Sequence, residues 1–128
     1  MSEQPSGSNG RQRVKVYELL ARDLKHLGVT SVFGLMSDDT VEFAVTLDAM
    51  GLRFYGARHE NNAVNMAEGY AASTGGLGVA LIGRGPATAN GLHGSVYALR
   101  TGSKVLLMAG EAAVMGGAPN GVGPDYKA

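Results

Sequence analysis

The chain has 128 residues, and its 11 basic side chains balance 11 acidic ones, so its formal net charge is zero. This length suits one domain, and a chain without excess positive charge is not expected to bind nucleic acid or an anionic membrane. Cysteine is missing from the sequence, which excludes disulfides and thiolate chemistry and makes the cytoplasm the expected location.

The first half of the chain predicts a polar tail, two helices and a strand. Residues 1–12 are rich in serine, glycine and glutamine, and we expect them to form a disordered tail. Apolar residues at steps of three and four predict a helix over residues 13–27. Its apolar face would consist of Val16, Leu19, Leu20, Leu24 and Leu27. A β-prone run predicts a strand over residues 31–35, and helical spacing behind an acidic start predicts a helix over residues 39–50.

The second half begins with an apolar and aromatic run that predicts a strand over residues 52–57. A helix over residues 60–74 should follow, ended by glycine at 75 and 76. Its inner face would consist of Ala63, Met66, Ala67, Tyr70 and Ala71. Apolar runs predict buried strands over residues 78–83 and 104–109. Neither run approaches the roughly 20 residues of a membrane-spanning helix.

Between these two strands, a turn at residues 83–86 should lead into a helix that ends at Thr101. Its inward face would consist of Ala89, Leu92, Val96 and Leu99. Beyond Glu111 the chain is rich in glycine, alanine and proline, and residues 116–128 are interpreted as a tail or a truncated end.

Strands that alternate with helices predict an α/β fold with a mainly parallel sheet and right-handed crossovers. Ligands on such sheets gather at the carboxyl ends of the strands. The segments to search are therefore residues 35–39, 58–60 and 83–90, and the chain from residue 110 onward. All four are polar or glycine-rich.

Taken alone, the short motifs in these segments are weak. Gly83-x-Gly85 has Thr88 where a dinucleotide-binding motif needs its third glycine, and no acidic residue follows at the expected spacing. A tight turn is the commoner reading, and an unrelated doubly wound nucleotide binder remains an alternative. His59 and Glu60 stand at a strand-to-helix corner, where an acidic side chain often serves only as a partner of the helix dipole.

A longer ordered pattern carries more information. It consists of Gly28-Val29, Val32-Phe33-Gly34, Arg58-His59-Glu60, Ala63, Met66-Ala67-Glu68-Gly69-Tyr70-Ala71, Thr74-Gly75, Gly78-Val79, and Gly85-Pro86 with Asn90. In this order the residues resemble the N-terminal pyrimidine-binding domain of thiamine-diphosphate-dependent enzymes of the acetolactate synthase and 2-keto acid decarboxylase superfamily. The resemblance covers residues 13–111 and is far more specific than any single glycine motif.

The resemblance implies a three-layer α/β/α sandwich of the thiamine-diphosphate-binding type over residues 13–115, incomplete at its C-terminus. It makes Glu60 the catalytic carboxylate that hydrogen-bonds N1′ of the cofactor's aminopyrimidine ring. It places Gly85, Pro86 and Asn90 beside the pyrimidine and the substrate. The implied activity is decarboxylation or carboligation of 2-keto acids, with an acetolactate-synthase-like enzyme as the leading type.

The chain also departs from the family's pattern. Relatives hold the diphosphate and Mg²⁺ with a Gly-Asp-Gly motif on a separate domain, and this sequence has no such motif. No metal ligand is therefore assigned here, and the chain alone is not expected to be active. The implied partners are a diphosphate-binding domain of the same or a second subunit, further copies in a dimer or tetramer, and a 2-keto acid. FAD is left open as a cofactor of the parent enzyme.

Gly85-Pro86-Ala87 stands where relatives have Gly-Pro-Gly. The extra methyl group supports an alternative function, a truncated or degenerate non-catalytic domain that associates with a full-length relative.

Overall fold

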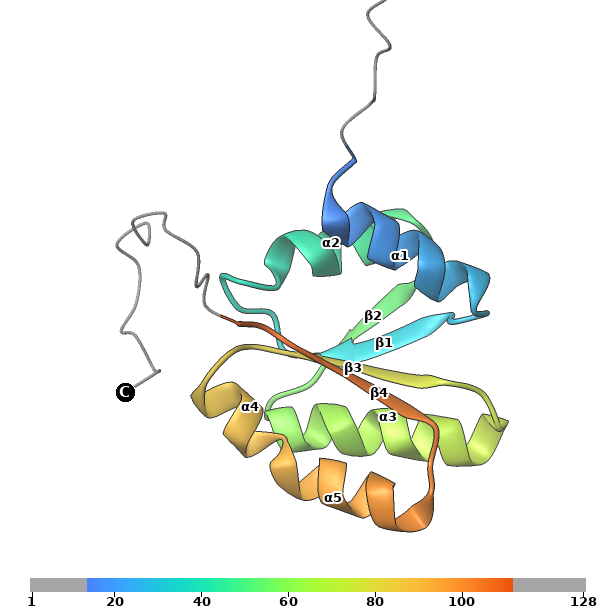
Figure 1. Ribbon diagram of the computed structural model, residues 1–128, viewed down its shortest axis with the longest axis vertical. Helices are drawn as coiled ribbons and strands as arrows, with labels where there is room; N and C mark the ends of the chain where they lie inside the picture. The colour runs from blue at the N-terminus through green and yellow to red at the C-terminus, as the bar shows by residue number, and fades with distance from the viewer. Residues whose placement is uncertain (1–13, 112–128) are drawn as a thin grey trace, which may run out of the picture.

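Helices and strands alternate along residues 14–111, the part of the chain that the computed structural model describes (Figure 1). The elements are α1 (Val16–His26), β1 (Ser31–Gly34), α2 (Val41–Ala49), β2 (Arg53–Gly56), α3 (Glu60–Thr74), β3 (Gly78–Ile82), α4 (Pro86–Asn90), α5 (Leu92–Thr101) and β4 (Val105–Ala109). The tail predicted at residues 1–12 and the end predicted at residues 116–128 lie outside the described residues. No helix within residues 14–111 is long and apolar enough to cross a membrane.

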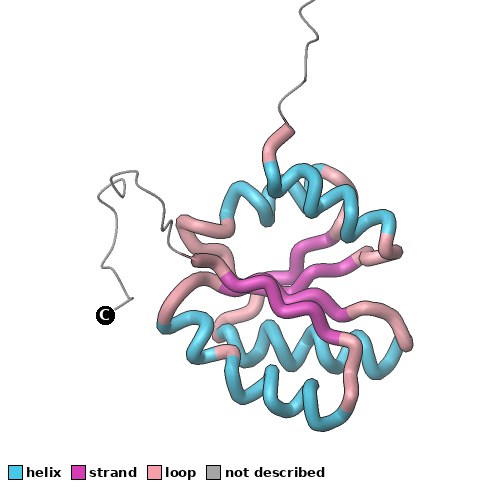
Figure 2. The backbone as a smooth tube through the Cα atoms, in the orientation of Figure 1, coloured by secondary structure: helices cyan, strands magenta, loops and turns pink. Residues whose placement is uncertain are grey.

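The strands form one parallel sheet in the order β2-β1-β3-β4. Val32 of β1 pairs with Phe54 of β2 on one side and with Val79 of β3 on the other. Helices α1 and α2 cover one face of the sheet, and α3, α4 and α5 lie on the opposite face (Figures 1 and 2). The predicted α/β fold with three layers is thereby confirmed.

Two apolar clusters fill the spaces between the layers. The cluster under α1 and α2 is built around the fully buried Leu47, with Val32, Leu52 and Val79. The cluster under α3 contains Phe33, Val64, Ala67 and Ala80. All five residues of β3 are buried, as expected for a central strand that contributes side chains to both clusters.

Helix α3 has the bounds that the sequence predicts, and it packs close to the sheet because the facing residues are small. Ala63, Ala67 and Ala71 are buried in this interface. Gly78 allows the backbone of β3 to approach the Ala67 carbonyl, where no Cβ would fit. Met66 was expected on this inner face, but its side chain is 38% exposed. One predicted inner position of α3 is therefore wrong.

The helix predicted from the turn at residues 83–86 to Thr101 differs in two respects. It is divided at Gly91 into α4 and α5, and its large apolar residues are exposed rather than buried. The predicted inward residues that are exposed are Ala89, Leu92, Val96 and Leu99. Gly94 and Ala98 face inward instead. The physical reason is the short distance to α3, because only glycine and alanine fit between helices that lie this close.

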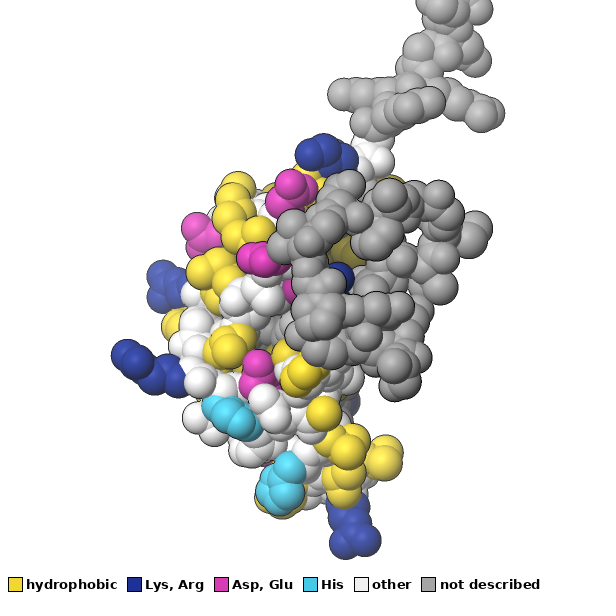
Figure 3. Space-filling model, turned by 90° about the vertical axis from the view of Figure 1, so that its left-hand side faces the viewer, with side chains coloured by type: hydrophobic (Ala, Val, Ile, Leu, Met, Phe, Trp, Pro, Cys, Tyr) yellow, Lys and Arg dark blue, Asp and Glu magenta, His cyan; other side chains and the backbone are white. Residues whose placement is uncertain are grey.

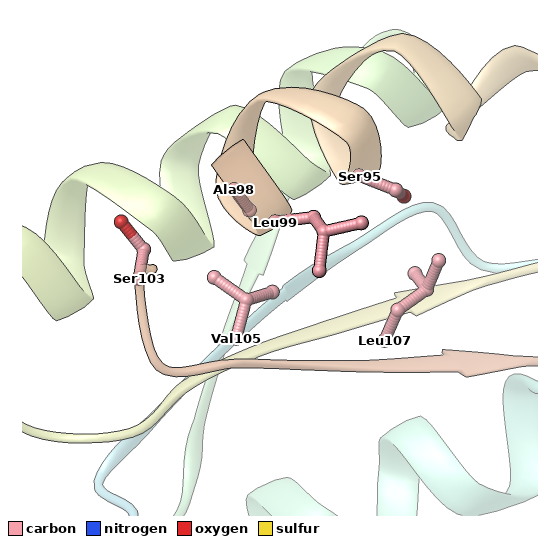
Figure 4. Close-up of a pocket in the computed structure, with 6 residues that line it drawn as sticks. All are labelled: Ser95, Ala98, Leu99, Ser103, Val105 and Leu107. Carbon is pink, nitrogen blue, oxygen red and sulfur yellow. The ribbon is translucent and has the colours of Figure 1, made fainter. Parts of the chain in front are cut away.

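Helix α1 and strand β4 are also less buried than the sequence predicts. In α1 the buried residues are Ala21 and Leu24, whereas four of the five predicted apolar residues are exposed: Val16, Leu19, Leu20 and Leu27. Strand β4 was expected to be covered on both faces, but it is only partly buried because it lies at the edge of the described sheet. Leu99 of α5 points toward Val105 and Leu107 of β4 across an open groove (Figure 4).

Candidate functional site

The loops that follow the strands meet at one edge of the sheet, because every pair of neighbouring strands is parallel. Their proximity is visible at two glycines. A Cβ on Gly83 would lie 2.8 Å from Oγ of Ser37, and Gly110 packs directly against the carboxylate of Asp39. Figure 3 faces this side of the molecule, where acidic, histidine and hydrophobic side chains are interspersed. Of the segments that the sequence selected for ligand binding, residues 35–39 and 83–90 therefore come together with Gly110.

Glu60 is the first residue of α3 and lies just after β2. The preceding His59 is the N-cap, with extended backbone, and its Nδ1 accepts a hydrogen bond of 3.1 Å from the amide of Asn61. His59 therefore satisfies one of the unpaired amides at the start of the helix. The Glu60 carboxylate lies where the helix dipole favours negative charge, and its side chain is half-buried.

Asn90 contacts Glu60 directly. The Nδ2 amide of Asn90 donates a hydrogen bond of 3.0 Å to Oε2 of Glu60, although the two residues are 30 positions apart in the sequence. Asn90 is the last residue of α4, so β3 and its turn carry it to the start of α3. The structure thus brings together two of the four predicted site residues.

The other two predicted site residues, Gly85 and Pro86, form the start of α4. Gly85 is the N-cap with φ of 59°, a conformation that favours glycine, and Pro86 occupies the first turn. The turn is closed by the Thr88 hydroxyl, which donates to the carbonyl of Gly83 over 3.1 Å. This geometry accounts for the residue types at positions 85 and 86 by their role in the turn.

Asn61 is part of this site although no sequence motif indicated it. Its Oδ1 accepts a hydrogen bond of 2.7 Å from the amide of Gly94, which ties the start of α3 to the start of α5. A Cβ on Gly94 would lie 3.0 Å from the same Oδ1 and 2.8 Å from Oδ1 of Asn65. The spacing of Gly91 and Gly94 is the signal that would have indicated this close approach of the helices.

An open pocket of about 580 Å³ lies on the side of α4 that faces β4. It is lined by Gly85, Thr88, Ala89, Leu92, Ala109, Gly110 and Glu111. Gly85 is the predicted site residue that contributes to this pocket, whereas Glu60 and Asn90 are not part of its lining. Helix α4 therefore borders two distinct regions, the polar Glu60–Asn90 pair and this mainly apolar pocket.

The described residues offer no site for a metal ion made of three or more His, Asp or Glu side chains. Two perturbed basic groups belong to other parts of the chain. The pKa of Lys15 is raised, mainly by its hydrogen bond with Tyr17. The pKa of Arg53 is raised, mainly by the hydrogen bond that its guanidinium donates to the Tyr55 hydroxyl. Both side chains therefore remain cationic at neutral pH.

Comparison with known proteins gives a consistent set of relatives. The family model described as "Thiamine pyrophosphate enzyme, N-terminal TPP binding domain" matches residues 14–118. The acetolactate synthase large subunit of Buchnera aphidicola from Schizaphis graminum is 31% identical over 97 residues, which cover 75% of this chain and 17% of that protein. A 2-hydroxyacyl-CoA lyase of Arabidopsis thaliana is 37% identical over 76 residues, which cover 59% of this chain and 13% of the lyase.

Among solved structures, a chain from Mycobacterium smegmatis described as a thiamin diphosphate-dependent enzyme matches with a TM-score of 0.66 and 26% identity. The match covers 80% of this chain and 20% of that one. This chain therefore spans a fifth or less of the length of these three relatives.

Proposed function

The chain belongs to the thiamine pyrophosphate enzyme family through its N-terminal TPP-binding domain, and from this we propose that Glu60 binds the aminopyrimidine half of the cofactor. Thiamine pyrophosphate is the same compound as thiamine diphosphate. The observation that carries the proposal is the position of Glu60 at the carboxyl edge of a parallel sheet, half-buried and hydrogen-bonded to Asn90. Ligands of such sheets bind at this edge.

The residues present fit the pyrimidine half of the cofactor. Within residues 14–111 the structure gives the Glu60 carboxylate one hydrogen-bond partner, the Asn90 amide on Oε2. The other carboxylate oxygen remains an acceptor for a ring N–H, which is the group that a protonated N1′ offers. When bound, thiamine diphosphate supplies the carbanion chemistry that 2-keto acid decarboxylation needs. Glu60 would hold the proton at N1′ and orient the ring.

Residues 13–115 are proposed as the pyrimidine-binding domain, with Gly85, Pro86 and Asn90 as further residues of its cofactor site. Gly85 and Pro86 would present the backbone of the turn before α4 to the ring, and the positive φ of Gly85 supports this role. Asn90 would border the ring through its contact with Glu60.

The diphosphate and Mg²⁺ are proposed to be held by another domain of the same or a second subunit in a dimer or tetramer. Magnesium takes carboxylate and phosphate oxygens in octahedral geometry, and the Gly-Asp-Gly motif that would carry such a carboxylate is missing from the sequence. The parent enzyme would act on a 2-keto acid in the cytoplasm, with acetolactate-synthase-like carboligation as the leading reaction. Relatives named as synthase and lyase support this class of chemistry.

The test combines the purified chain with a separately produced diphosphate-binding domain from an acetolactate synthase relative. Isothermal titration calorimetry should detect binding of thiamine diphosphate with Mg²⁺ only in the mixture. In that mixture Glu60→Gln should slow exchange of the thiazolium C2 proton by about 10²- to 10⁴-fold, the usual range for loss of a proton-transfer group. Glu42→Gln, on the outer helix α2, is the matched control and should leave the exchange rate unchanged.

If the mixture binds no cofactor, the alternative of a non-catalytic domain that pairs with a relative is favoured. If it binds the cofactor and Glu60→Gln exchanges the proton at the normal rate, the role of Glu60 is refuted.

A further inference from the structure

We propose that Asn90 is a positioning residue, whose amide fixes the Glu60 carboxylate so that one particular oxygen faces the ligand. This inference rests on the proposed function and goes beyond it, because it assigns to Asn90 an action through Glu60. The hydrogen bond from Nδ2 of Asn90 engages Oε2 of Glu60 over 3.0 Å. The remaining oxygen, Oε1, is thereby the one presented to a ring N–H.

A glutamate needs such a partner at this position. Its side chain has several rotatable bonds, and holding a long polar side chain in one rotamer costs conformational entropy of up to about 2 kcal/mol. Glu60 is only half-buried, so packing alone does not select its rotamer. An amide that donates to one oxygen supplies the missing constraint and, being neutral, does not compete with the ligand as a cation would.

Asn90 can perform this task because its own backbone is held at both ends of α4. At the start, the Thr88 hydroxyl donates to the carbonyl of Gly83 over 3.1 Å and closes the turn. At the end, Gly91 packs against the buried Ile82, where a Cβ would lie 2.8 Å from Cδ1. The short helix therefore places the Asn90 amide at a fixed height above the sheet.

A second tie joins the same two parts of the chain. Asn61 follows Glu60 on α3, and its Oδ1 accepts from the amide of Gly94, just beyond Asn90, over 2.7 Å. The hydrogen bonds Glu60–Asn90 and Asn61–Gly94 thus both connect the start of α3 to the junction of α4 with α5. The Asn61–Gly94 hydrogen bond joins a side chain to the backbone and sets the spacing of the helices. The Asn90–Glu60 hydrogen bond acts on the carboxylate itself.

The contact can be tested in the chain without any cofactor. In ¹H–¹⁵N spectra, the Asn90 side-chain amide should have one proton shifted downfield, and Glu60→Ala should remove that shift. Glu68→Ala is the matched control, because Glu68 lies on the same helix but accepts from Ser103 instead, and it should leave the Asn90 signals unchanged. Asn90 signals that do not respond to Glu60→Ala would overturn the inference.

The positioning role is tested in the mixture with the diphosphate-binding domain. Asn90→Ala removes the donor, and Asn90→Asp replaces it with a group that repels the carboxylate. Both should slow C2 proton exchange. Asn90→Ala should slow it by roughly 10- to 100-fold, the value of one hydrogen bond to a charged group, and Asn90→Asp by more. Because Asn90 is exposed, both variants should keep the wild-type circular dichroism spectrum.

The outcomes separate the two proposals. Slower exchange in the Asn90 variants, with a larger loss for Glu60→Gln, supports both. A loss for Glu60→Gln with none for either Asn90 variant overturns the positioning role alone. If Glu60→Gln exchanges at the wild-type rate, the proposed function fails and the positioning role fails with it, even though the amide contact itself persists in the spectra.

Discussion

Substitution of Gly78 by alanine should destabilise the domain severely, because β3 and α3 meet there backbone to backbone. A Cβ on Gly78 would lie 1.9 Å from the carbonyl oxygen of Ala67, whereas ordinary van der Waals contact begins near 3.4 Å. The helix and the strand would therefore have to separate by about 1.5 Å, the difference between these two distances. The buried Val64, Ala67 and Ala80 would lose their packing in the process.

The magnitude follows from the stiffness of protein interiors. Overpacking a core costs about 1–3 kcal/mol and sometimes more, and a clash between two backbone segments cannot be relieved by a change of rotamer. We expect Gly78→Ala to lower the free energy of unfolding by about 3 kcal/mol or more. This is a large part of the roughly 5–15 kcal/mol that a domain possesses.

Urea unfolding followed by circular dichroism measures this difference, with Gly69→Ala as the control. Gly69 lies within α3, and a Cβ there would meet no atom within 4 Å. Gly69→Ala should therefore raise the free energy of unfolding by about 0.5–1 kcal/mol through helix propensity. A Gly78→Ala protein with a free energy of unfolding within about 0.5 kcal/mol of wild type would refute the close contact of β3 with α3.

Four further substitutions test the packing and the site. Leu47→Ala, at a fully buried position, should lower the free energy of unfolding by about 2–5 kcal/mol. Leu99→Ala, at a residue that is 82% exposed, should change it by less than about 0.5 kcal/mol, and equal losses for the two variants would contradict the exposure of Leu99. Gly94→Ala should lower the free energy of unfolding by about 1–2 kcal/mol, because crowding against Asn61 outweighs a gain of about 1 kcal/mol in helix propensity. A variant that is more stable than wild type in thermal unfolding would argue against the close Asn61–Gly94 contact. His59→Ala should cost about 0.5–2 kcal/mol through loss of the N-cap, measured by urea unfolding, and an unchanged midpoint would show that the cap contributes nothing.

The alternation of strands and helices and the bounds of α3 could be predicted from the amino-acid sequence. These features depend on local signals: apolar spacing, small residues, and a glycine at position 75 that adopts the left-handed conformation after the helix. Because the strands are short and separated by helices, a parallel sheet follows, and its carboxyl edge must carry the segment with Glu60. The family pattern along residues 13–111 indicated the cofactor class for the same reason, since it consists of short local segments in a fixed order along the chain.

Which side of each helix faces inward depends on how the helices pack, and this could not be predicted from the sequence. The apolar spacing of α5 selected Leu92, Val96 and Leu99, but the close approach of α3 admits only Gly94 and Ala98. Periodicity shows that a helix has an apolar side, whereas the distance to its neighbour determines which side chains fit. Likewise, the contact of Asn90 with Glu60 spans 30 positions, and it exists because two helices meet, which no local pattern encodes.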